Sequence, residues 1–253
     1  MRILGFLNRR EQTSAEKMTV FSGERAFELS ILRHPKARRY TIRVRNASRD
    51  VVLTMPKRGS LADAHRFAQN NAAWIASKLA QLPDVVPFAA GEIIPFRGVP
   101  HRIEHLASAR GTAWVEQDES GNALLCVAGD AAHIARRVSD FLKREAKKAL
   151  TERSRFYAAK LGVGIGRIGL RDSATRWGSC SESGSLSYSW RLILAPDFVL
   201  DYLAAHEIAH RIELNHSDRF WRLLDSMTPD RRRAEAWLNA QGNTLHRYGK
   251  ARR

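Results

Sequence analysis

Three histidines, and a glutamate directly after the first of them, have a spacing suited to metal chemistry in the segment AAHEIAHRIELNHSDRFW, residues 204–221. Residues four apart on a helix lie about 40° apart around the axis and about 6 Å along it, so His206 and His210 can direct their imidazoles at one ion. Neutral imidazole is a good zinc ligand. Glu207 projects about 100° away from His206, which leaves it within reach of a water on the metal. The pattern therefore predicts a metal-dependent hydrolytic site in which Glu207 is the general base.

A third ligand is expected, because catalytic zinc usually has three protein ligands and one open position. His216, six residues after His210, is the predicted third ligand, and Glu235 on a later helix is the rival. The chain must turn before His216; Asn215 can make this turn in a left-handed conformation, and Ser217 can cap the next helix. A lone H-E-x-x-H also arises by chance on exposed helices, but the third histidine and the apolar residues before the motif favour a metal site.

The hydrophobic patterning predicts an α+β protein in three parts. Residues 1–22 are a loose basic tail, and residues 23–129 form a mostly β N-terminal domain with one helix over 60–82. Residues 130–253 form the metal-binding domain, which begins with a long helix over 131–161 that ends at Gly162. Two short strands and three helices follow. The predicted buried side of the long helix comprises Ile134, Val138, Phe141, Leu142, Ala146, Ala149, Leu150 and Phe156.

The C-terminal half resembles the YgjP-like metallopeptidases, relatives of the SprT-like and WLM zinc proteases. The matching features are Trp177-Gly178-Ser179-Cys180, a proline-started helix with the H-E-x-x-H motif, and Asn215-His216-Ser217 followed by Phe220-Trp221. Upstream, residues 37–44, 74–75 and 91–103 also resemble the family. The resemblance implies a minimal zincin-like domain with a small antiparallel sheet, a peptidase activity, and one zinc ion at the three histidines. The strand before the active helix departs from the family pattern at Tyr188 and Trp190.

In zincins generally, an exposed strand edge beside the active helix pairs with an extended substrate, and here that strand would be residues 186–194. Tyr188, Arg191 and Arg176 are the predicted substrate-binding side chains, and His246 is a further candidate for stabilising an oxyanion. Cys180 fits a small buried thiol better than a fourth ligand, because a thiolate in the open position would block water activation.

The charge of the chain is its most unusual bulk property. It has 253 residues with 42 Lys/Arg and 26 Asp/Glu, a net charge of +16, and residues 1–60 alone carry 14 Lys/Arg against 5 Asp/Glu. Such a surface attracts polyanions, so weak, sequence-indifferent binding of nucleic acid is predicted. The most basic stretch is residues 34–45, where Arg39, Arg43 and Arg45 would share one face of a strand.

The remaining features favour a cytosolic protein. The two cysteines, Cys126 and Cys180, form no CxxC motif, the N-terminal apolar stretch is too short for a signal peptide, and no run is long enough to span a membrane. The first hypothesis is a zinc peptidase in which Glu207 activates a zinc-bound water to attack a peptide carbonyl. The alternatives are a zinc-dependent nucleotide or phosphoester hydrolase, and a basic nucleic-acid-associated module with a structural metal. Glu207 argues against the last, because a structural metal needs no general base.

Overall fold

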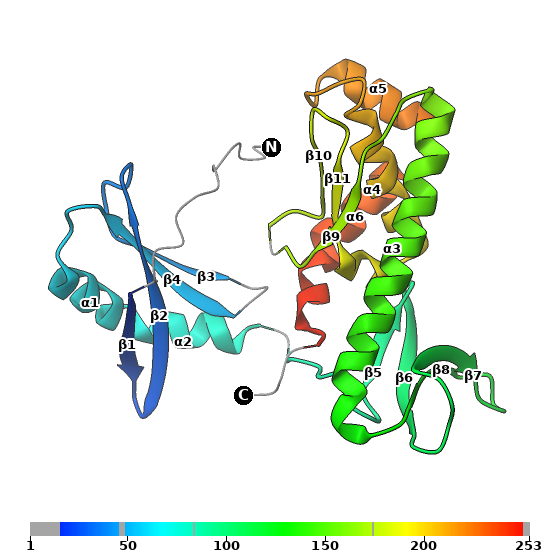
Figure 1. Cartoon of the computed structure of the whole chain (residues 1–253). Helices are drawn as coiled ribbons and strands as arrows, with labels where there is room; N and C mark the ends of the chain where they lie inside the picture. The colour runs from blue at the N-terminus through cyan, green and yellow to red at the C-terminus, as the bar shows by residue number, and fades with distance from the viewer. Residues whose placement is uncertain (1–15, 46–48, 83, 174, 250–253) are drawn as a thin grey trace. The chain divides into compact units, whose positions relative to one another are not determined.

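The computed structural model in Figure 1 describes residues 16–45, 49–82, 84–173 and 175–249, so most of the predicted N-terminal tail lies outside the described residues. The chain divides into two compact units, Met1–Leu82 and Pro83–Arg253, and each is described by itself. The α+β class is confirmed. The division between the units lies well before the predicted boundary at residue 129, because the strands after residue 82 pack on the long helix of the second unit. No helix in the described part of the chain has the length and apolar character needed to cross a membrane.

The first unit is a four-stranded sheet covered on one face by two helices. The sheet runs in the order β1-β2-β4-β3, with β1 and β3 antiparallel to their neighbours and β2 parallel to β4. The strands are β1 (Lys17–Ser22), β2 (Arg25–His34), β3 (Thr41–Arg45) and β4 (Asp50–Pro56). Residues 17–22 were expected in the tail, but Val20 is fully buried in the core of this unit, and alternation around it makes the segment a strand.

The helix predicted over residues 60–82 is two helices, α1 (Leu61–Asn70) and α2 (Ala72–Ala80). They meet at Asn71, whose backbone leaves the helical region with φ −104° and ψ 8°. The Asn71 side chain donates to the carbonyl of Phe67 at 2.8 Å, competing with the regular backbone ladder. Their apolar sides, including Ala64, Ala68 and Ile75, complete the core of the first unit.

The second unit begins with a sheet of the same strand order. Strands β5 (Ile93–Phe96), β6 (Val99–Leu106), β7 (Ala113–Gln117) and β8 (Ala123–Ala128) run in the order β5-β6-β8-β7, and the middle pair is again parallel. This repetition of topology has no detectable counterpart in the sequence. Ile94, Ile103 and Leu125 share one core with Val138 and Phe141 of the following helix, which explains why this sheet belongs to the second unit.

The long helix α3 (Ile134–Leu161) follows the short 3-10 turn η1 (Ala131–His133) and ends at Gly162, which has φ 64° as predicted for a left-handed stop. In Figure 1, β5–β8 lie beside its N-terminal half and α4 beside its C-terminal half. The prediction of a buried Phe156 was wrong, since this side chain is 50% exposed. The buried stripe continues instead through Ser154 and Tyr157, four and seven residues beyond Leu150.

A three-stranded sheet precedes the helix that carries the H-E-x-x-H motif. Its strands β9 (Ile168–Arg171), β10 (Gly178–Cys180) and β11 (Leu186–Ser189) run in the order β10-β11-β9. The predicted small antiparallel sheet is mixed, because β11 is antiparallel to β10 but parallel to β9. The predicted free edge at residues 186–194 was wrong, since β11 is the central strand and Trp190–Leu194 form the 3-10 helix η2. The remaining elements are α4 (Asp197–Ala209), α5 (Asp218–Met227), α6 (Arg231–Gln241) and η3 (Gly242–Arg247).

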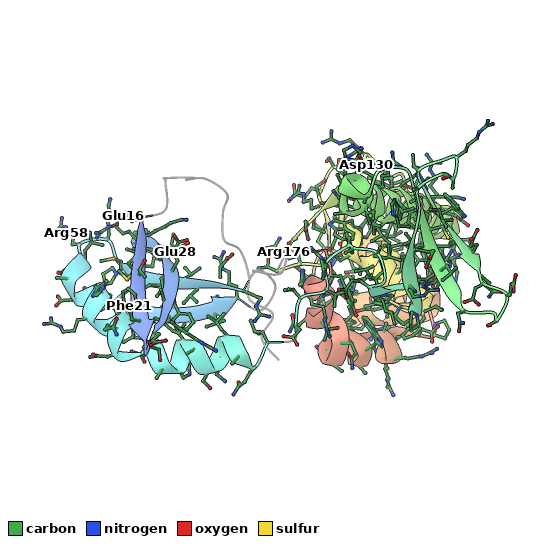
Figure 2. All side chains as sticks on the ribbon, turned by 90° about the horizontal axis from the view of Figure 1, so that it is seen from below. Glu16, Phe21, Glu28, Arg58, Asp130 and Arg176 are labelled. Atoms are coloured by element: carbon green, nitrogen blue, oxygen red, sulfur yellow. The ribbon has the colours of Figure 1, made fainter. Side chains whose placement is uncertain are left out.

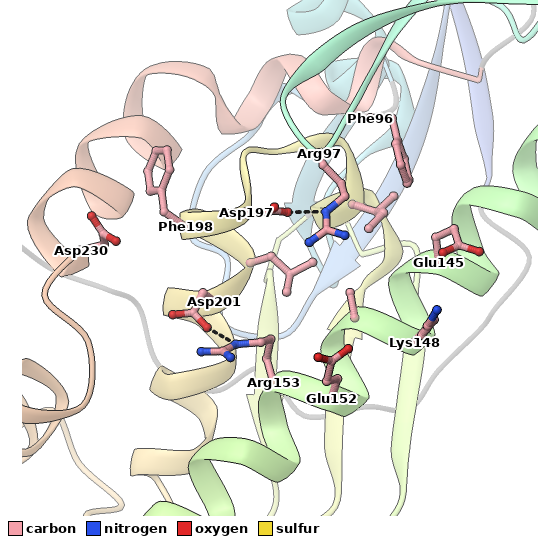
Figure 3. Close-up of a pocket in the computed structure, with 13 residues that line it drawn as sticks. Phe96, Arg97, Glu145, Lys148, Glu152, Arg153, Asp197, Phe198, Asp201 and Asp230 are labelled. Atoms are coloured by element: carbon pink, nitrogen blue, oxygen red, sulfur yellow. Dashed lines mark hydrogen bonds and ion pairs between the residues drawn. The ribbon is translucent and has the colours of Figure 1, made fainter. Parts of the chain in front are cut away.

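Ion pairs around a polar cavity of about 550 Å³ anchor the N-terminal half of α4 (Figure 3). Arg97, in the turn between β5 and β6, donates to Asp197 in the first turn of α4 at 2.6 Å. Arg153 of α3 pairs with Asp201, which also accepts the Tyr157 hydroxyl at 2.5 Å. The histidines lie at the other end of α4, so these contacts fix the direction in which the helix presents them.

Candidate metal centre

Helix α4 carries the histidine motif through the interior of the second unit. Ala204, Ala205, Ile208 and Ala209 are all fully buried, and their small or compact side chains let other elements pack closely around the helix. The helix ends at Ala209, and His210 forms its C-cap. An isolated peptide with this composition would gain little from helix formation, so the position of the motif depends on this packing.

The turn to His216 differs from the prediction. In the described part of the chain the non-glycine residues with positive φ are Arg49 and Arg97, so Asn215 does not take a left-handed conformation. The helix ends earlier than expected, and residues 210–213 form the turn, with the N–H of Glu213 donating to the carbonyl of Ala209 at 3.0 Å. The predicted cap at Ser217 is confirmed, since its hydroxyl accepts the N–H of Phe220 at 3.4 Å.

The three histidines come together at the end of α4. One ring nitrogen from each of His206, His210 and His216 lies within 4.8 Å of the others. The Nε2 atoms of His206 and His216 are 3.0 Å apart. Two nitrogens on a tetrahedral zinc with bonds of about 2.0 Å would be roughly 3.3 Å apart. The triad therefore fits a zinc ion without a large rearrangement.

The second ring nitrogens have protein partners that favour a ligand-ready tautomer. Nδ1 of His210 lies 3.0 Å from the carbonyl oxygen of Glu213, to which it donates, and this leaves Nε2 as the lone-pair nitrogen. Nδ1 of His206 lies 3.4 Å from the Tyr202 hydroxyl. Such contacts orient metal ligands and fix their protonation.

Aromatic side chains from α5 form the wall of the site. The ring of Phe220 lies 4.6–5.0 Å from each of the three imidazoles, measured between centroids. Trp221 stacks on His216 at 5.4 Å with 25° between the planes. His216 is the most exposed of the three histidines, so this stacking restricts a side chain that would otherwise be mobile.

The environment keeps the three imidazoles neutral. Burial lowers the pKa of His206 to about 3, with smaller contributions from the neighbouring His210 and His216. Burial also lowers the pKa of His210 and of His216. Neutral imidazole is the form that binds metal, so the protein does not have to release protons from these rings to bind a cation near neutral pH.

Glu235, the rival third ligand, is not part of the triad. Its carboxylate accepts the Tyr202 hydroxyl at 3.1 Å and lies 3.5 Å from Arg231. The guanidinium of Arg231 in turn lies 5.2 Å from the centre of the Trp221 ring. Glu235 thus belongs to a chain of contacts that runs behind the imidazoles, through Tyr202 to His206. Tyr202 stands one helical turn before His206, a spacing from which this contact could have been predicted.

Glu207 lies in the interior beside the triad, with 4% of its surface exposed. Burial raises the pKa of its carboxyl to about 8, and the charge of Arg176 and the backbone N–H of Cys180 act in the opposite direction. Glu207 is therefore a carboxyl group with little access to water and with one fixed hydrogen-bond donor, the N–H of Cys180. Raised carboxylate pKa values of this kind are common among residues that transfer protons.

Gly178 on the edge strand β10 makes room for Glu207. A Cβ atom at this position would lie 2.8 Å from both Cγ and Cδ of Glu207, closer than real contacts allow. Gly178→Ala is therefore expected to displace the carboxylate, and a displacement of about 1 Å at a catalytic group costs on the order of 10²-fold in turnover. Metal content, measured by elemental analysis, should stay at the wild-type level because the crowded side chain is Glu207 rather than an imidazole.

Gly169 provides the matched control for this substitution. It lies on β9 of the same sheet, and a Cβ there would have its nearest neighbour at 3.8 Å, an ordinary contact. Gly169→Ala should keep wild-type turnover. Equal activity in the two variants would mean that Gly178 is not needed for the position of Glu207.

The predicted substrate-binding residues lie in different places. Tyr188 is 1% exposed and its hydroxyl is 3.0 Å from that of Ser154. Arg191 is also buried, and it donates to both carboxylate oxygens of Asp172, at 2.7 and 3.0 Å, and to two backbone carbonyls. These contacts place both side chains in the core. Arg176 alone of the three is exposed, and its charge acts on Glu207.

The two other side chains considered from the sequence also have structural surroundings. His246 is 5% exposed and stacks on Trp177 at 5.3 Å. Cys180 is half-buried outside the triad, and burial followed by the nearby Glu207 raises the pKa of its thiol. Among the described residues, the side chains that converge at the candidate metal centre are the three histidines, and Cys180 is not one of them.

Comparison with known proteins agrees with this arrangement of residues. No curated protein and no solved structure matches the chain. A family model described as the YgjP-like metallopeptidase domain matches residues 38–241, which include β3, both units' helices and the complete histidine triad. The match extends over most of the 253 residues. The chain belongs to the YgjP-like metallopeptidase family.

Proposed function

We propose that the protein is a peptidase that uses one zinc ion held by His206, His210 and His216. The observation that carries this proposal is the convergence of three neutral imidazole nitrogens within 4.8 Å. All three proposed ligands are imidazoles, which suit zinc, and three protein ligands are the usual number at a catalytic site. A zinc ion held there would polarise a substrate carbonyl and lower the pKa of a bound water.

Glu207 is the proposed general base of this reaction. It follows His206 directly on α4, is buried, and is held by the N–H of Cys180. A divalent cation nearby favours the ionised carboxylate, which is the form that accepts a proton. Glu207 would take the proton from the attacking water and return it to the amine that leaves.

The edge strand β10 is the proposed place for the substrate backbone. The N–H of Ser189 bonds to the carbonyl of Trp177, and the N–H of Ser181 to that of Ser185. By the alternation of an antiparallel pair, Gly178 and Cys180 then direct their backbone groups away from β11. The N–H of Cys180 bonds to Glu207, so the groups proposed for the substrate are those of Gly178 and the carbonyl of Cys180. A peptide that added to this edge would lie beside Glu207. Arg176, exposed just before β10, is the proposed contact for a substrate oxygen.

We also place the protein in the cytosol, as the sequence predicted. Cys126 and Cys180 are both free thiols, which suits a reducing compartment.

A screen of hydrolytic activity tests the function. Purified protein loaded with zinc would be incubated with a mixed peptide library, an unfolded protein and nucleoside triphosphates, each with and without a chelator. We expect chelator-sensitive cleavage of peptide bonds, detected by mass spectrometry of the products. Cleavage of triphosphates without any peptide cleavage would replace the peptidase with a phosphoester hydrolase. Zinc binding without any hydrolysis would favour a structural metal.

A further inference from the structure

A group of exposed cations gathers at one end of the sheet of the first unit, and it has no part in the proposed hydrolysis. Lys36, Arg38 and Arg39 lie on the connection from β2 to β3, and Lys57 and Arg58 lie on the connection from β4 to α1. All five are exposed. These five residues are called the basic end below.

Strand pairing explains why two stretches about twenty residues apart in the sequence meet. Strands β2 and β4 are parallel neighbours, and His34 near the end of one pairs with Pro56 at the end of the other. Both following connections therefore leave the sheet at the same end. Nη1 of Arg33 ties them together by donating to the carbonyls of Lys57 at 3.2 Å and Gly59 at 3.0 Å.

The acidic residues near the basic end are already paired. Glu16 lies 3.4 Å from Arg33, and Asp63 pairs with Arg66 within α1. Among the described residues, no carboxylate forms an ion pair with any of the five cations. Figure 2 shows Arg58 on the side of the sheet where Glu16 lies, away from Phe21 at the opposite end. The basic end is therefore a concentration of positive charge to which the described residues supply no ion-pair partner.

The neighbouring sheet face is less basic than the sequence predicted. Of the three arginines predicted to share one face of a strand, Arg39 lies before β3, so only Arg43 and Arg45 are on the exposed face of that strand. Arg45 is opposite Asp50, and Glu28 follows in the same row across the sheet, because Leu29 pairs with Val51. Asp50 thus lies beside the cations of the face, and Glu28 pairs with Lys17 at 2.8 Å, whereas in the described part of the chain no carboxylate pairs with a cation of the basic end.

We propose that the basic end binds the phosphate backbone of nucleic acid, and binds a duplex more tightly than a single strand. Five cations on two fixed connections match closely spaced phosphates, and duplex DNA presents about one charge per 1.7 Å. Tyr40, the aromatic residue on the connection from β2 to β3, is engaged within the first unit: its ring packs 6.0 Å from that of Phe67, and its hydroxyl donates to the Ser60 carbonyl at 3.3 Å. The proposed contact therefore relies on phosphates rather than on bases stacked on this ring. Binding to phosphates alone carries no sequence readout.

Titration of the full-length protein against a labelled 20-base-pair duplex, and against one of its strands, tests this proposal at several salt concentrations. Two double variants, Arg38→Gln with Arg39→Gln and Lys57→Gln with Arg58→Gln, each remove two charges from one connection. We expect each to weaken duplex binding and to reduce the slope of log affinity against log salt by about 0.9 for each phosphate that the variant no longer neutralises. Combining the four substitutions should reduce the slope further.

A control variant of equal charge separates the site from net charge. Arg25→Gln with Lys78→Gln also removes two cations from the first unit, one at the start of β2 and one on α2, both outside the basic end. This variant should keep the wild-type slope. An equal decrease in affinity in the control and the test variants would overturn the proposal in favour of a diffuse charge effect.

Three further outcomes would also overturn the proposal. One is no binding of either nucleic acid at low salt. Another is tighter binding of the single strand than of the duplex. The third is stronger binding to phosphatidylserine vesicles than to the duplex, which would assign the basic end to a membrane surface. Hydrolysis is measured in parallel, and the proposal predicts wild-type peptidase activity in all variants of the basic end, so its failure is distinguishable from failure of the proposed function.

Discussion

Glu207→Gln is expected to abolish most of the hydrolysis while the protein keeps its metal and its fold. The amide has nearly the same shape and can still accept the N–H of Cys180. It cannot accept a proton from water, and general-base catalysis contributes typically 10²–10⁴-fold. Turnover of a peptide identified in the activity screen should fall by about that factor. The buried site at Glu207 tolerates a neutral group, since burial already disfavours the charged carboxylate.

Glu182→Gln is the matched control for this substitution. Glu182 lies in the turn that directly follows β10, but its side chain is exposed. This substitution should leave turnover, zinc content and thermal stability at their wild-type values. A Glu207→Gln protein that retains zinc and wild-type turnover would remove Glu207 from the mechanism and leave Arg176 or the metal alone to account for activity.

The histidine triad could be predicted from the sequence because its first two members depend only on helix geometry. A spacing of four residues determines their relative direction on any helix. The sequence predicted that His216 joins the other two histidines, but not how the chain reaches it. The turn uses residues 210–213 rather than a left-handed Asn215. The sequence favoured His216 over Glu235, and the structure adds that Glu235 contacts Tyr202 and is not among the three residues that converge.

The sheet order around the site was not predictable, since it depends on which distant segments pair. The alternation of residues 186–189 indicates a strand, but nothing in it indicates that β9 pairs on one side and β10 on the other. This pairing buries Tyr188 and makes β10 the edge strand next to Glu207. Arg191 was likewise an attractive candidate by residue type alone, and only the structure shows that Asp172 and two carbonyls use its donors.

The domain boundary illustrates the same limit. Residues 93–128 have the strand-like alternation of the first unit and share its strand order, so grouping them with the N-terminal segment was natural. Their buried residues pack on α3, and this contact joins them to the second unit. Local patterning indicates which face of a strand is buried but not which element covers it.

Alanine substitution of the histidines is expected to have the second large effect, on zinc affinity. Removal of any one of His206, His210 or His216 leaves two protein ligands, and the dissociation constant for zinc, measured by competition with a chromophoric chelator, should rise well beyond about 100-fold. Removal of an outer-shell partner typically costs about 10–100-fold in metal affinity, so removal of a ligand should exceed this range. His216→Ala is the most informative of the three, because His216 is the most exposed and its removal disturbs the core least.

The zinc dissociation constants of two further variants, compared with those of the histidine variants, distinguish ligands from supporting residues. Tyr202→Phe removes the hydroxyl that contacts His206 without touching the triad, and it should raise the dissociation constant by about 10–100-fold. Glu235→Gln keeps an oxygen that accepts this hydroxyl and removes only the negative charge, so it should have a smaller effect. Tyr188→Phe, which removes a buried hydroxyl bonded to Ser154 instead, should bind zinc as the wild type does. If Glu235→Gln lost zinc as completely as His206→Ala while His216→Ala retained it, the third ligand would be Glu235. The Tyr202 hydroxyl lies between Glu235 and Nδ1 of His206. This arrangement argues for His216 as the third ligand, because the Glu235 carboxylate is occupied by that hydroxyl and by Arg231 and supports the His206 imidazole from behind.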